Sequence, residues 1–183
     1  MKRMVLVALL MLPLAAFARE WKVDAAHSAL TFTGTYQDEK FEGRFKRFDA
    51  KIDYDPADLA HAKFDVTIDI ASVDTANTER DQALPGKDFF DIVQFPRAHF
   101  VTTRFRKAAN GDVLADGMLS LHGVSKPVTL AVKFSQAGNG ATLDVDTTLK
   151  RLDFGIGSGD WADTSMIGNG VAVHGHLVLH AAK

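Results

Sequence analysis

The stretch FEGRFKRFDAKIDY, residues 41–54, carries an alternation of apolar and polar side chains that changes phase once. The apolar residues fall on odd positions before Lys46-Arg47 and on even positions after it: Phe41, Gly43 and Phe45, then Phe48, Ala50, Ile52 and Tyr54. Successive side chains of a strand point to opposite faces, so a shift of one residue turns a buried face toward water. The phase change therefore predicts either a β-bulge at Lys46-Arg47 or two short strands joined by a kink. Either arrangement bends the sheet strongly.

Further segments with strand-like alternation follow and precede this stretch. They are residues 28–36, 63–71, 113–121, 127–134, 141–149 and 170–179, and residues 99–105 are apolar on both phases, so their inward set is not predicted. Turn signals separate them, at Asp55-Pro56, Asn110-Gly111, His122-Gly123 and Gly138-Asn139-Gly140. Eight strands of even spacing, one of them sharply bent, predict an all-β antiparallel sandwich or barrel, and the bend favours the barrel.

One segment, at about residues 75–94, lacks strand alternation and predicts a short helical excursion. Asp74 or Thr75 is expected to cap a helix that runs to Leu84, before Pro85-Gly86 ends it. Four large apolar residues then follow closely: Phe89, Phe90, Ile92 and Phe95. They have to be buried at the mouth or flank of the barrel, either as simple packing or as a lid over a ligand.

The N-terminus predicts export. A short basic region, an apolar run and Ala16-Phe17-Ala18 are typical of a signal peptide cleaved after Ala18, which leaves residues 19–183 as a single domain. The apolar run is too short for a membrane anchor, so the mature chain is expected in the periplasm and not across a membrane. The formal net charge of -2 provides no basic surface for nucleic acid, and the absence of Cys excludes disulfides and thiolate metal sites.

No motif predicts catalysis or a cofactor. His174, His176 and His180 share one face of the last strand, opposite its apolar phase, so they are expected to face solvent without a metal. The glycine-rich GIGSGDW, residues 155–161, opens no periodic helix and is expected to be a loop near the rim rather than a phosphate-binding loop. The chain is therefore expected not to be an enzyme.

Small residues occupy several inward positions among the aromatic ones: Gly34, Gly43, Ala50, Ala115, Gly117 and Gly175. An eight-stranded barrel is either filled by its own side chains or holds one small ligand. The glycines either leave dry volume for a long apolar molecule or relieve strain where the strands coil. The residues alone leave both interpretations open.

A succession of motifs resembles the YceI-like family of bacterial polyisoprenoid-binding proteins. These are WKVDAAHSALTF, FEGRF, SVDTANTERDQALPGKDFFDIVQFPRAHF, GMLSLHGVSKPVTLAV and RLDFGIG, which together cover nearly the whole mature chain in order. The resemblance implies an extended, lipocalin-like eight-stranded antiparallel barrel with an apolar channel. It further implies binding of a long-chain isoprenoid lipid, such as a polyprenyl pyrophosphate or a prenylated quinone, without catalysis. At Tyr36-Gln37-Asp38 the chain departs from a His and a Gly that many members carry.

The resemblance and the inward phases together nominate the binding residues. His27 and Arg80, which match the family motifs, are expected at the rim near a headgroup. The expected channel residues are Phe32, Gly34, Tyr36, Phe41, Phe45, Phe64, Val66, Phe89, Phe90, Phe100, Gly117, Leu119, Val132 and Phe154.

Two functions follow as hypotheses. The first is a periplasmic carrier that sequesters the isoprenoid lipid in the channel. The alternative is a non-catalytic adaptor in envelope stress or membrane redox chemistry, which acts through its surface and has a filled barrel. The oligomeric state, a homodimer included, stays open.

Overall fold

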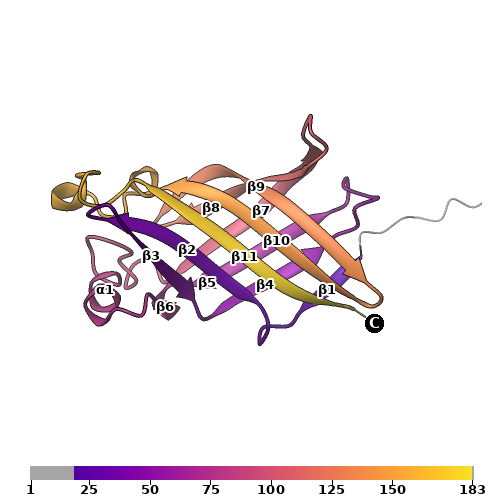
Figure 1. The fold of residues 1–183 in the computed structure, drawn as a ribbon, viewed down its shortest axis with the longest axis horizontal. Coiled ribbons are helices and arrows are strands. Elements are labelled where there is room, and N and C mark those ends of the chain that lie inside the picture. The colour runs from indigo at the N-terminus through magenta and orange to yellow at the C-terminus, as the bar shows by residue number, and fades with distance from the viewer. Residues whose placement is uncertain (1–18, 183) are drawn as a thin grey trace, which may run out of the picture.

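Antiparallel strands make up most of the computed structural model, which describes residues 19–182 (Figure 1). The strands are β1 (Glu20–Val23), β2 (Ala29–Tyr36), β3 (Glu39–Phe45), β4 (Phe48–Asp53), β5 (Lys63–Asp69), β6 (Val73–Asp74), β7 (Arg97–Lys107), β8 (Val113–Leu121), β9 (Val124–Ala137), β10 (Gly140–Lys150) and β11 (Gly170–Ala181). The helical segments are α1 (Thr78–Ala83) and the short 3-10 turns η1 (Ile70–Ser72), η2 (Arg151–Phe154) and η3 (Gly159–Trp161). None of these helices has the length and apolar character that crossing a bilayer requires.

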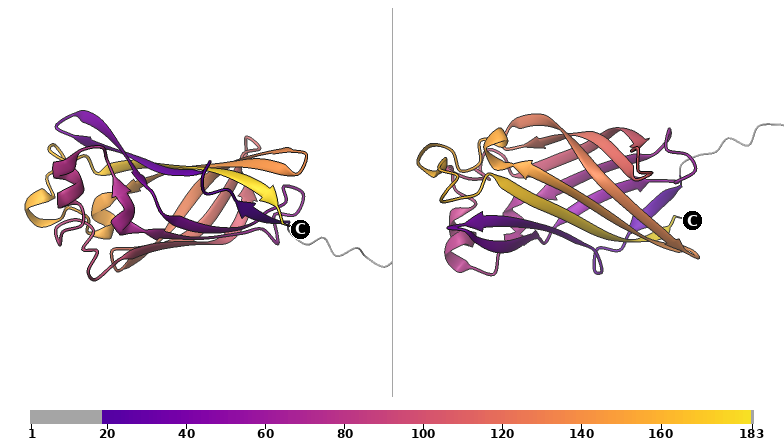
Figure 2. Two further views of the ribbon diagram at one scale, coloured as in Figure 1. Left: turned by 90° about the horizontal axis from the view of Figure 1, so that it is seen from below. Right: turned by 45° about the horizontal axis from the view of Figure 1, so that its top comes forward.

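The sheet closes on itself because β11 pairs with both β1 and β2. Three pairs of short strands each form one interrupted strand of the barrel: β1 with β2, β3 with β4, and β5 with β6. The interrupted strand β3–β4 pairs on one side with β2 and β1 and on the other side with β6 and β5. Counted in this way, eight strands surround the axis, and the prediction of an eight-stranded antiparallel barrel is confirmed. Figure 2 shows α1 and the long loops at one end of the barrel and the C-terminus at the other.

The phase change at Lys46-Arg47 corresponds to a kink between two short strands. β3 ends at Phe45 and β4 begins at Phe48, and the facing strand is interrupted at the same level by η1. The Lys46 amide donates to the Ser72 carbonyl at 3.1 Å, and the Arg47 amide donates to Ser72 Oγ at 3.0 Å. Of the two interpretations of the sequence, the kink is thus correct, and both interrupted strands bend together.

Ion pairs hold the kink on its outer side. Asp74 accepts from Arg44 at 3.0 Å and from Lys46 at 2.9 Å, while Asp69 accepts from Arg47 at 2.9 Å. The hydrogen bond with Lys46, followed by those with the Ala76 amide and Arg44, lowers the pKa of Asp74 to about 2. The carboxylate therefore favours the folded chain while it is ionised.

A bulge explains why residues 99–105 are apolar on both phases. The pairing of β7 with β8 shifts register between Thr102 and Arg104, so that one residue of β7 has no counterpart. Phe100, before the shift, and Phe105, after it, both belong to the interior although their numbers differ in parity. The inward set of this strand changes phase in mid-strand.

Aromatic rings of neighbouring strands, and not empty volume, lie beside several of the inward glycines. In three cases a ring from the neighbouring strand lies where a glycine Cβ would project: Phe41 over Gly34, Phe32 over Gly43, and Phe100 over Gly117. A Cβ at Gly34 would lie 2.7 Å from Phe41 Cζ, and one at Gly117 would lie 2.5 Å from Phe100 Cζ. Of the two interpretations left open by the sequence, empty volume does not apply at these positions, because a neighbouring ring occupies the space into which each glycine Cβ would project.

The interior at the end opposite α1 is solidly packed. Five aromatic rings contact one another there and are called the aromatic floor: Trp21, Tyr54, Phe64, Phe105 and Phe134. Tyr54 is their centre, with ring centroids 5.8, 5.7 and 4.9 Å from those of Phe64, Phe105 and Phe134. The Trp21 indole N–H donates to the Tyr54 carbonyl at 2.9 Å. Burial, with a smaller contribution from Asp55, raises the pKa of the Tyr54 phenol.

We expect Asp74→Asn to lower the midpoint of thermal unfolding at neutral pH and to flatten its dependence on acid. A carboxyl whose pKa is depressed in the folded chain stabilises it above the unfolded pKa of about 3.9, and this contribution is lost as the pH falls toward about 2. Unfolding midpoints measured between pH 7 and pH 2 test this, with Asp49→Asn on the exposed face of β4 as the control. Equal effects of both substitutions would contradict the role given to Asp74.

Gly117→Ala should destabilise the chain by about 1–3 kcal/mol, the usual result of overpacking a core. The added Cβ would meet the Phe100 ring and, at 2.6 Å, the Val101 carbonyl oxygen, which is backbone and cannot rotate away. Gly140→Ala is the matched control, because its Cβ would meet nothing closer than 3.5 Å. Urea unfolding of the two variants should show a clear loss of free energy only for Gly117→Ala. Similar values would mean that the ring does not depend on the glycine.

Candidate functional site

The half of the barrel toward α1 encloses a cavity of about 500 Å³. Inward residues of seven strands form much of its wall, and within a strand they lie two or four positions apart. They are Leu30, Phe32 and Gly34; Phe41 and Phe45; Val66 and Ile68; Leu119 and Leu121; Val128 and Leu130; Val145, Thr147 and Leu149; and Val171 and Val173. Nearly all are aliphatic or aromatic. Cavities of this size and lining take small apolar molecules, and apolar ones stay dry when empty.

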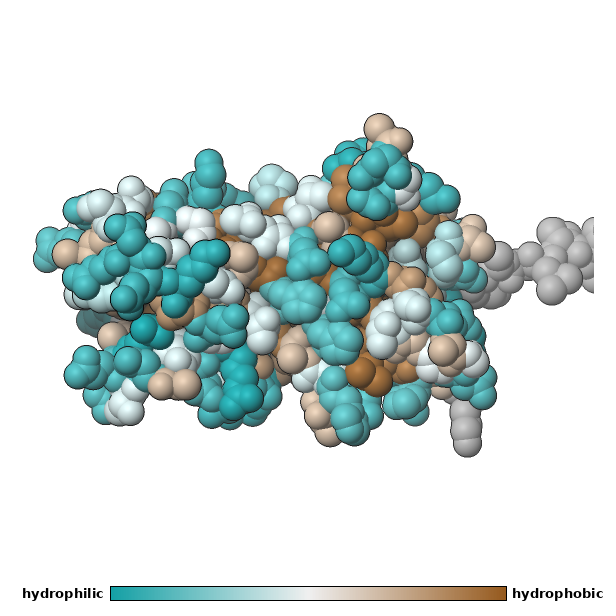
Figure 3. Space-filling model, in the orientation of Figure 1, coloured by the Kyte–Doolittle hydropathy of each residue, from teal (hydrophilic) through white to brown (hydrophobic). Residues whose placement is uncertain are grey.

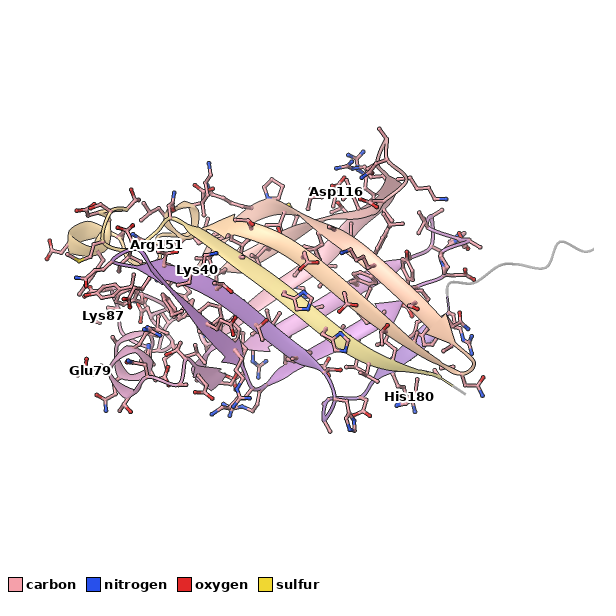
Figure 4. The ribbon with its side chains drawn as sticks, in the orientation of Figure 1. Lys40, Glu79, Lys87, Asp116, Arg151 and His180 are labelled. Carbon is pink, nitrogen blue, oxygen red and sulfur yellow. The ribbon has the colours of Figure 1, made fainter. Side chains whose placement is uncertain are left out.

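Among residues 19–182, charged side chains line the cavity only at the end covered by helical segments. Glu79 and Arg80 come from α1, and Arg151 comes from η2, whereas the barrel wall contributes none. Figure 4 shows Glu79, Lys87, Lys40 and Arg151 gathered at this end, far from His180 at the other. The outer surface of the face in Figure 3 is mostly hydrophilic, with hydrophobic residues showing between. The apolar surface of the site is therefore internal, and its polar part is a rim.

Arg80 lies over the rim with its guanidinium against an aromatic face. Its Cζ atom is 3.9 Å from the centroid of the Phe41 ring, a cation–π contact. Within the part of the chain that the structure describes, no hydrogen bond or ion pair engages the guanidinium. Its five N–H donors are thus available to a group at the mouth of the cavity.

The helix that carries Arg80 is shorter than expected and is capped differently. Helix α1 spans Thr78–Ala83, and the Asn77 side chain accepts the Arg80 amide at 2.9 Å as the N-cap. The prediction of Asp74 or Thr75 as the cap is wrong, because Asp74 belongs to the ion pairs of the kink. Thr75 instead donates its amide and hydroxyl to Asp81, at 2.8 and 2.7 Å, which ties the helix to the strand before it.

The segment after α1 covers the end of the barrel with its aromatic residues. Phe89 and Phe90 line the cavity. The ring of Phe89 is 5.6 Å from that of Trp161, and the ring of Phe90 is 6.2 Å from that of Phe45. Phe95 packs elsewhere, 5.0 Å from the His122 ring. Phe89 and Phe90 thus pack at the end of the barrel and line the cavity there, while a role of this segment as a lid over a ligand stays a prediction.

Arg151 organises the loop on the other side of the mouth. It is 5 % exposed, and its guanidinium donates to five backbone carbonyls: Ile156 at 2.9 Å, Gly157, Trp161 at 2.8 Å, Ile167 at 2.8 Å and Gly168 at 3.2 Å. No carboxylate among residues 19–182 pairs with it, and burial lowers its pKa. All five donors are used, so Arg151 positions the loop at residues 156–168 and leaves an unpaired positive charge beside the cavity.

The histidines of the last strand face solvent, as predicted. The Nδ1–H groups of His174 and His176 donate to the carboxylates of Asp146 and Asp144, at 2.8 and 2.6 Å, and the two side chains are 47 % and 40 % exposed. His180 lies 3.5 Å from Asp24. No group of three or more metal-binding side chains was found in the described residues.

Most of the residues nominated from the sequence lie together on the cavity. Those that line it are Phe32, Gly34, Tyr36, Phe41, Phe45, Val66, Phe89, Phe90, Phe100, Leu119, Phe154 and, at the rim, Arg80. Whether they contact a ligand stays a prediction.

Four nominated residues do not line the cavity. Phe64 and Val132 are inward but lie lower along the axis, in the packed core around the aromatic floor. Gly117 is covered by the Phe100 ring. His27 is 73 % exposed in the turn between β1 and β2, where it pairs with Asp24 at 2.9 Å. The alternation along a strand predicts whether a side chain points inward, but not how far along the barrel axis it lies. For this reason Phe64 and Val132 were expected in the channel although they belong to the packed core.

Several cavity residues were not nominated. Leu30 and Ile68 lie on the predicted inward face of their strands, so the alternation could have identified them as cavity residues. Arg151, Ile156 and Trp161 lie in 3-10 turns and loops, where no periodicity marks the inward side chains. Their placement depends on the carbonyl contacts of Arg151, which a sequence pattern does not reveal.

Comparison with known proteins agrees with this architecture. The family model of the YceI-like domain matches residues 21–179. A UPF0312 protein of Vibrio cholerae is 32 % identical over 91 % of this chain and 94 % of its own length. The crystal structure of Burkholderia cenocepacia BcnA is 34 % identical, with a TM-score of 0.82 over 86 % of this chain and 99 % of that one.

A more distant structure shares the fold. A polyisoprenoid binding domain from Saccharophagus degradans is 20 % identical and superposes with a TM-score of 0.67 over 91 % of this chain and all of that one. The order of the motifs, the closed barrel and the extent of the family match lead to one conclusion. The chain belongs to the YceI-like family.

Proposed function

We propose that this protein binds an isoprenoid lipid, with the hydrocarbon tail in the cavity and the headgroup at the rim near Arg80. The observation that carries the proposal is the cavity itself, which is apolar along the barrel wall and charged only where α1 and η2 cover it. A polyprenyl pyrophosphate or a prenylated quinone has the matching division between tail and headgroup. The family relationship and the name of the Saccharophagus degradans domain support the same class of ligand.

Tail burial supplies the free energy of binding in this proposal. Each CH₂ removed from water contributes about 0.8 kcal/mol, so a few isoprene units offset the cost of ordering a flexible chain. An apolar wall distinguishes ligands by length and girth more than by functional group. The protein acts as a carrier or store of the lipid, without a chemical step.

The carrier is proposed to work in the periplasm, after cleavage of a signal peptide behind Ala18. Residues 1–18 lie outside the described residues, so this part rests on the sequence pattern. The alternative, an adaptor with a filled barrel, is disfavoured because only the half at the aromatic floor is filled.

Protein purified from the periplasm of an expression host should carry a lipid that native mass spectrometry detects. Val173→Phe, which projects a ring into the cavity, should reduce the bound lipid at least about tenfold. Ala172→Phe places the same ring on the exposed face of β11 and should leave the bound lipid unchanged. Lipid retained by Val173→Phe, or absent from the unsubstituted protein after exposure to isoprenoids, would contradict the proposal.

Arg80→Met should weaken binding of a prenyl pyrophosphate about tenfold and leave a prenylated quinone with the same tail nearly unaffected. The reason is the loss of charge-assisted hydrogen bonds that only the anionic headgroup accepts. Calorimetric titration with both ligands measures the difference. Lys87→Met is the control, since Lys87 is exposed at the same end but does not line the cavity. Equal losses for both ligands would instead assign Arg80 a packing role on Phe41.

A further inference from the structure

We infer that Phe41 is a positioning residue, whose ring holds the Arg80 guanidinium at the mouth of the cavity and thereby favours an anionic headgroup over a neutral one. This inference rests on the proposed function and adds to it the residues that give Arg80 its place. The Phe41 ring is itself fixed by Gly34 on the neighbouring strand. A glycine of β2 therefore determines where a charge on α1 lies.

Helix α1 by itself does little to hold Arg80. It spans only Thr78–Ala83, and none of its residues is buried. A helix brings together side chains that are three or four positions apart. For Arg80 these positions hold Ala76, Asn77, Ala83 and Leu84, none of which is charged. A long and flexible arginine side chain in this setting has to be held from outside the helix.

An unpaired edge of β3 brings Phe41 to this helix. All the residues of β3 pair with β2, but on its other side only Arg44 and Phe45 pair, with β6. Within the part of the chain that the structure describes, residues 39–43 therefore have no strand beside them on that side. The guanidinium of Arg80 lies there instead, with Cζ 3.9 Å from the centroid of the Phe41 ring.

Two contacts from within the barrel fix the Phe41 ring. Gly34 is the residue directly opposite on β2, and a Cβ at Gly34 would lie 2.7 Å from Phe41 Cζ. The Phe32 ring meets the Phe41 ring edge to face, with centroids 6.4 Å apart and planes at 90°. A larger residue at position 34 would have to displace the Phe41 ring, and the guanidinium on that ring would move with it.

Stacking on a ring leaves a guanidinium able to bind an anion. Its N–H donors lie in its own plane and point past the ring. A phosphate accepts two such donors side by side in charge-assisted hydrogen bonds, which a neutral quinone carbonyl does not. Without the ring, the donors could turn to Glu79, which lines the same cavity. Loss of the ring should therefore weaken binding of the anionic headgroup more than binding of the neutral one.

The experiment compares the affinities of the purified protein for a prenyl pyrophosphate and for a prenylated quinone with the same tail. A change in the cavity wall alters both affinities, so the informative quantity is their ratio, measured by calorimetric titration. Phe41→Leu should lower the ratio about threefold, the effect expected from losing an exposed cation–π contact. Gly34→Ala should lower the ratio in the same direction by displacing the ring. Phe41→Leu adds no atoms beside Gly34 and stays informative if Gly34→Ala does not fold.

Phe95→Leu is the matched control. The Phe95 ring also lies over a glycine, with Cε1 2.7 Å from the place where a Gly123 Cβ would project. It contacts the His122 ring, however, and does not line the cavity. Loss of this ring should leave the ratio of the two affinities unchanged.

A double substitution shows whether the ring acts through the guanidinium. In Arg80→Met, the further change Phe41→Leu should no longer alter the ratio. The inference is overturned if Phe41→Leu leaves the ratio unchanged, or lowers it equally with and without Arg80, and the proposed function then still stands. If the unsubstituted protein binds neither ligand, the proposed function itself is wrong and the inference fails with it.

Discussion

Packing of five aromatic rings across the barrel determines where this protein has a core and where it has a cavity. Eight strands enclose a cross-section that side chains can fill, and the aromatic floor fills it at the end of the barrel where the C-terminus lies. Without Cys, the chain has no disulfides to hold its ends. The larger of the two buried hydrophobic clusters lies in this half of the interior, and a smaller one around Phe100, Leu119, Phe154 and Ile156 lies beside the cavity in the other half.

The hollow half is completed by parts of the chain that are not strands. Helix α1 and the segment after it cover one side of the mouth, and the loop that Arg151 holds by five carbonyls covers the other. Each of these two parts brings an arginine to the rim of an otherwise apolar site. In the described residues the guanidinium N–H donors of Arg80 engage no hydrogen-bond partner, whereas those of Arg151 are all used by backbone carbonyls. Arg80 is therefore suited to contact a headgroup, whereas Arg151 maintains the shape of the mouth.

The strand pattern predicted the closed barrel, the bend at Lys46-Arg47 and the solvent-facing histidines, because each depends on which face a side chain takes. It did not predict levels along the axis, so Phe64 and Val132 were placed in the channel although they lie in the core. It also left the role of the inward glycines open, since alternation does not show that a ring from the next strand covers Gly117. The cap at Asn77 and the carbonyl contacts of Arg151 depend on tertiary structure, which local patterns do not carry.

A crystal of the ligand-free protein under xenon pressure tests most directly whether the barrel is divided into a dry cavity and a solid floor. Xenon enters apolar cavities that exclude water. A barrel divided in this way should show xenon density in the cavity lined by Phe100, Val145 and Val173, and none among the rings of the aromatic floor. Ordered water throughout the cavity, or side chains that fill it and leave no site for xenon, would contradict the account.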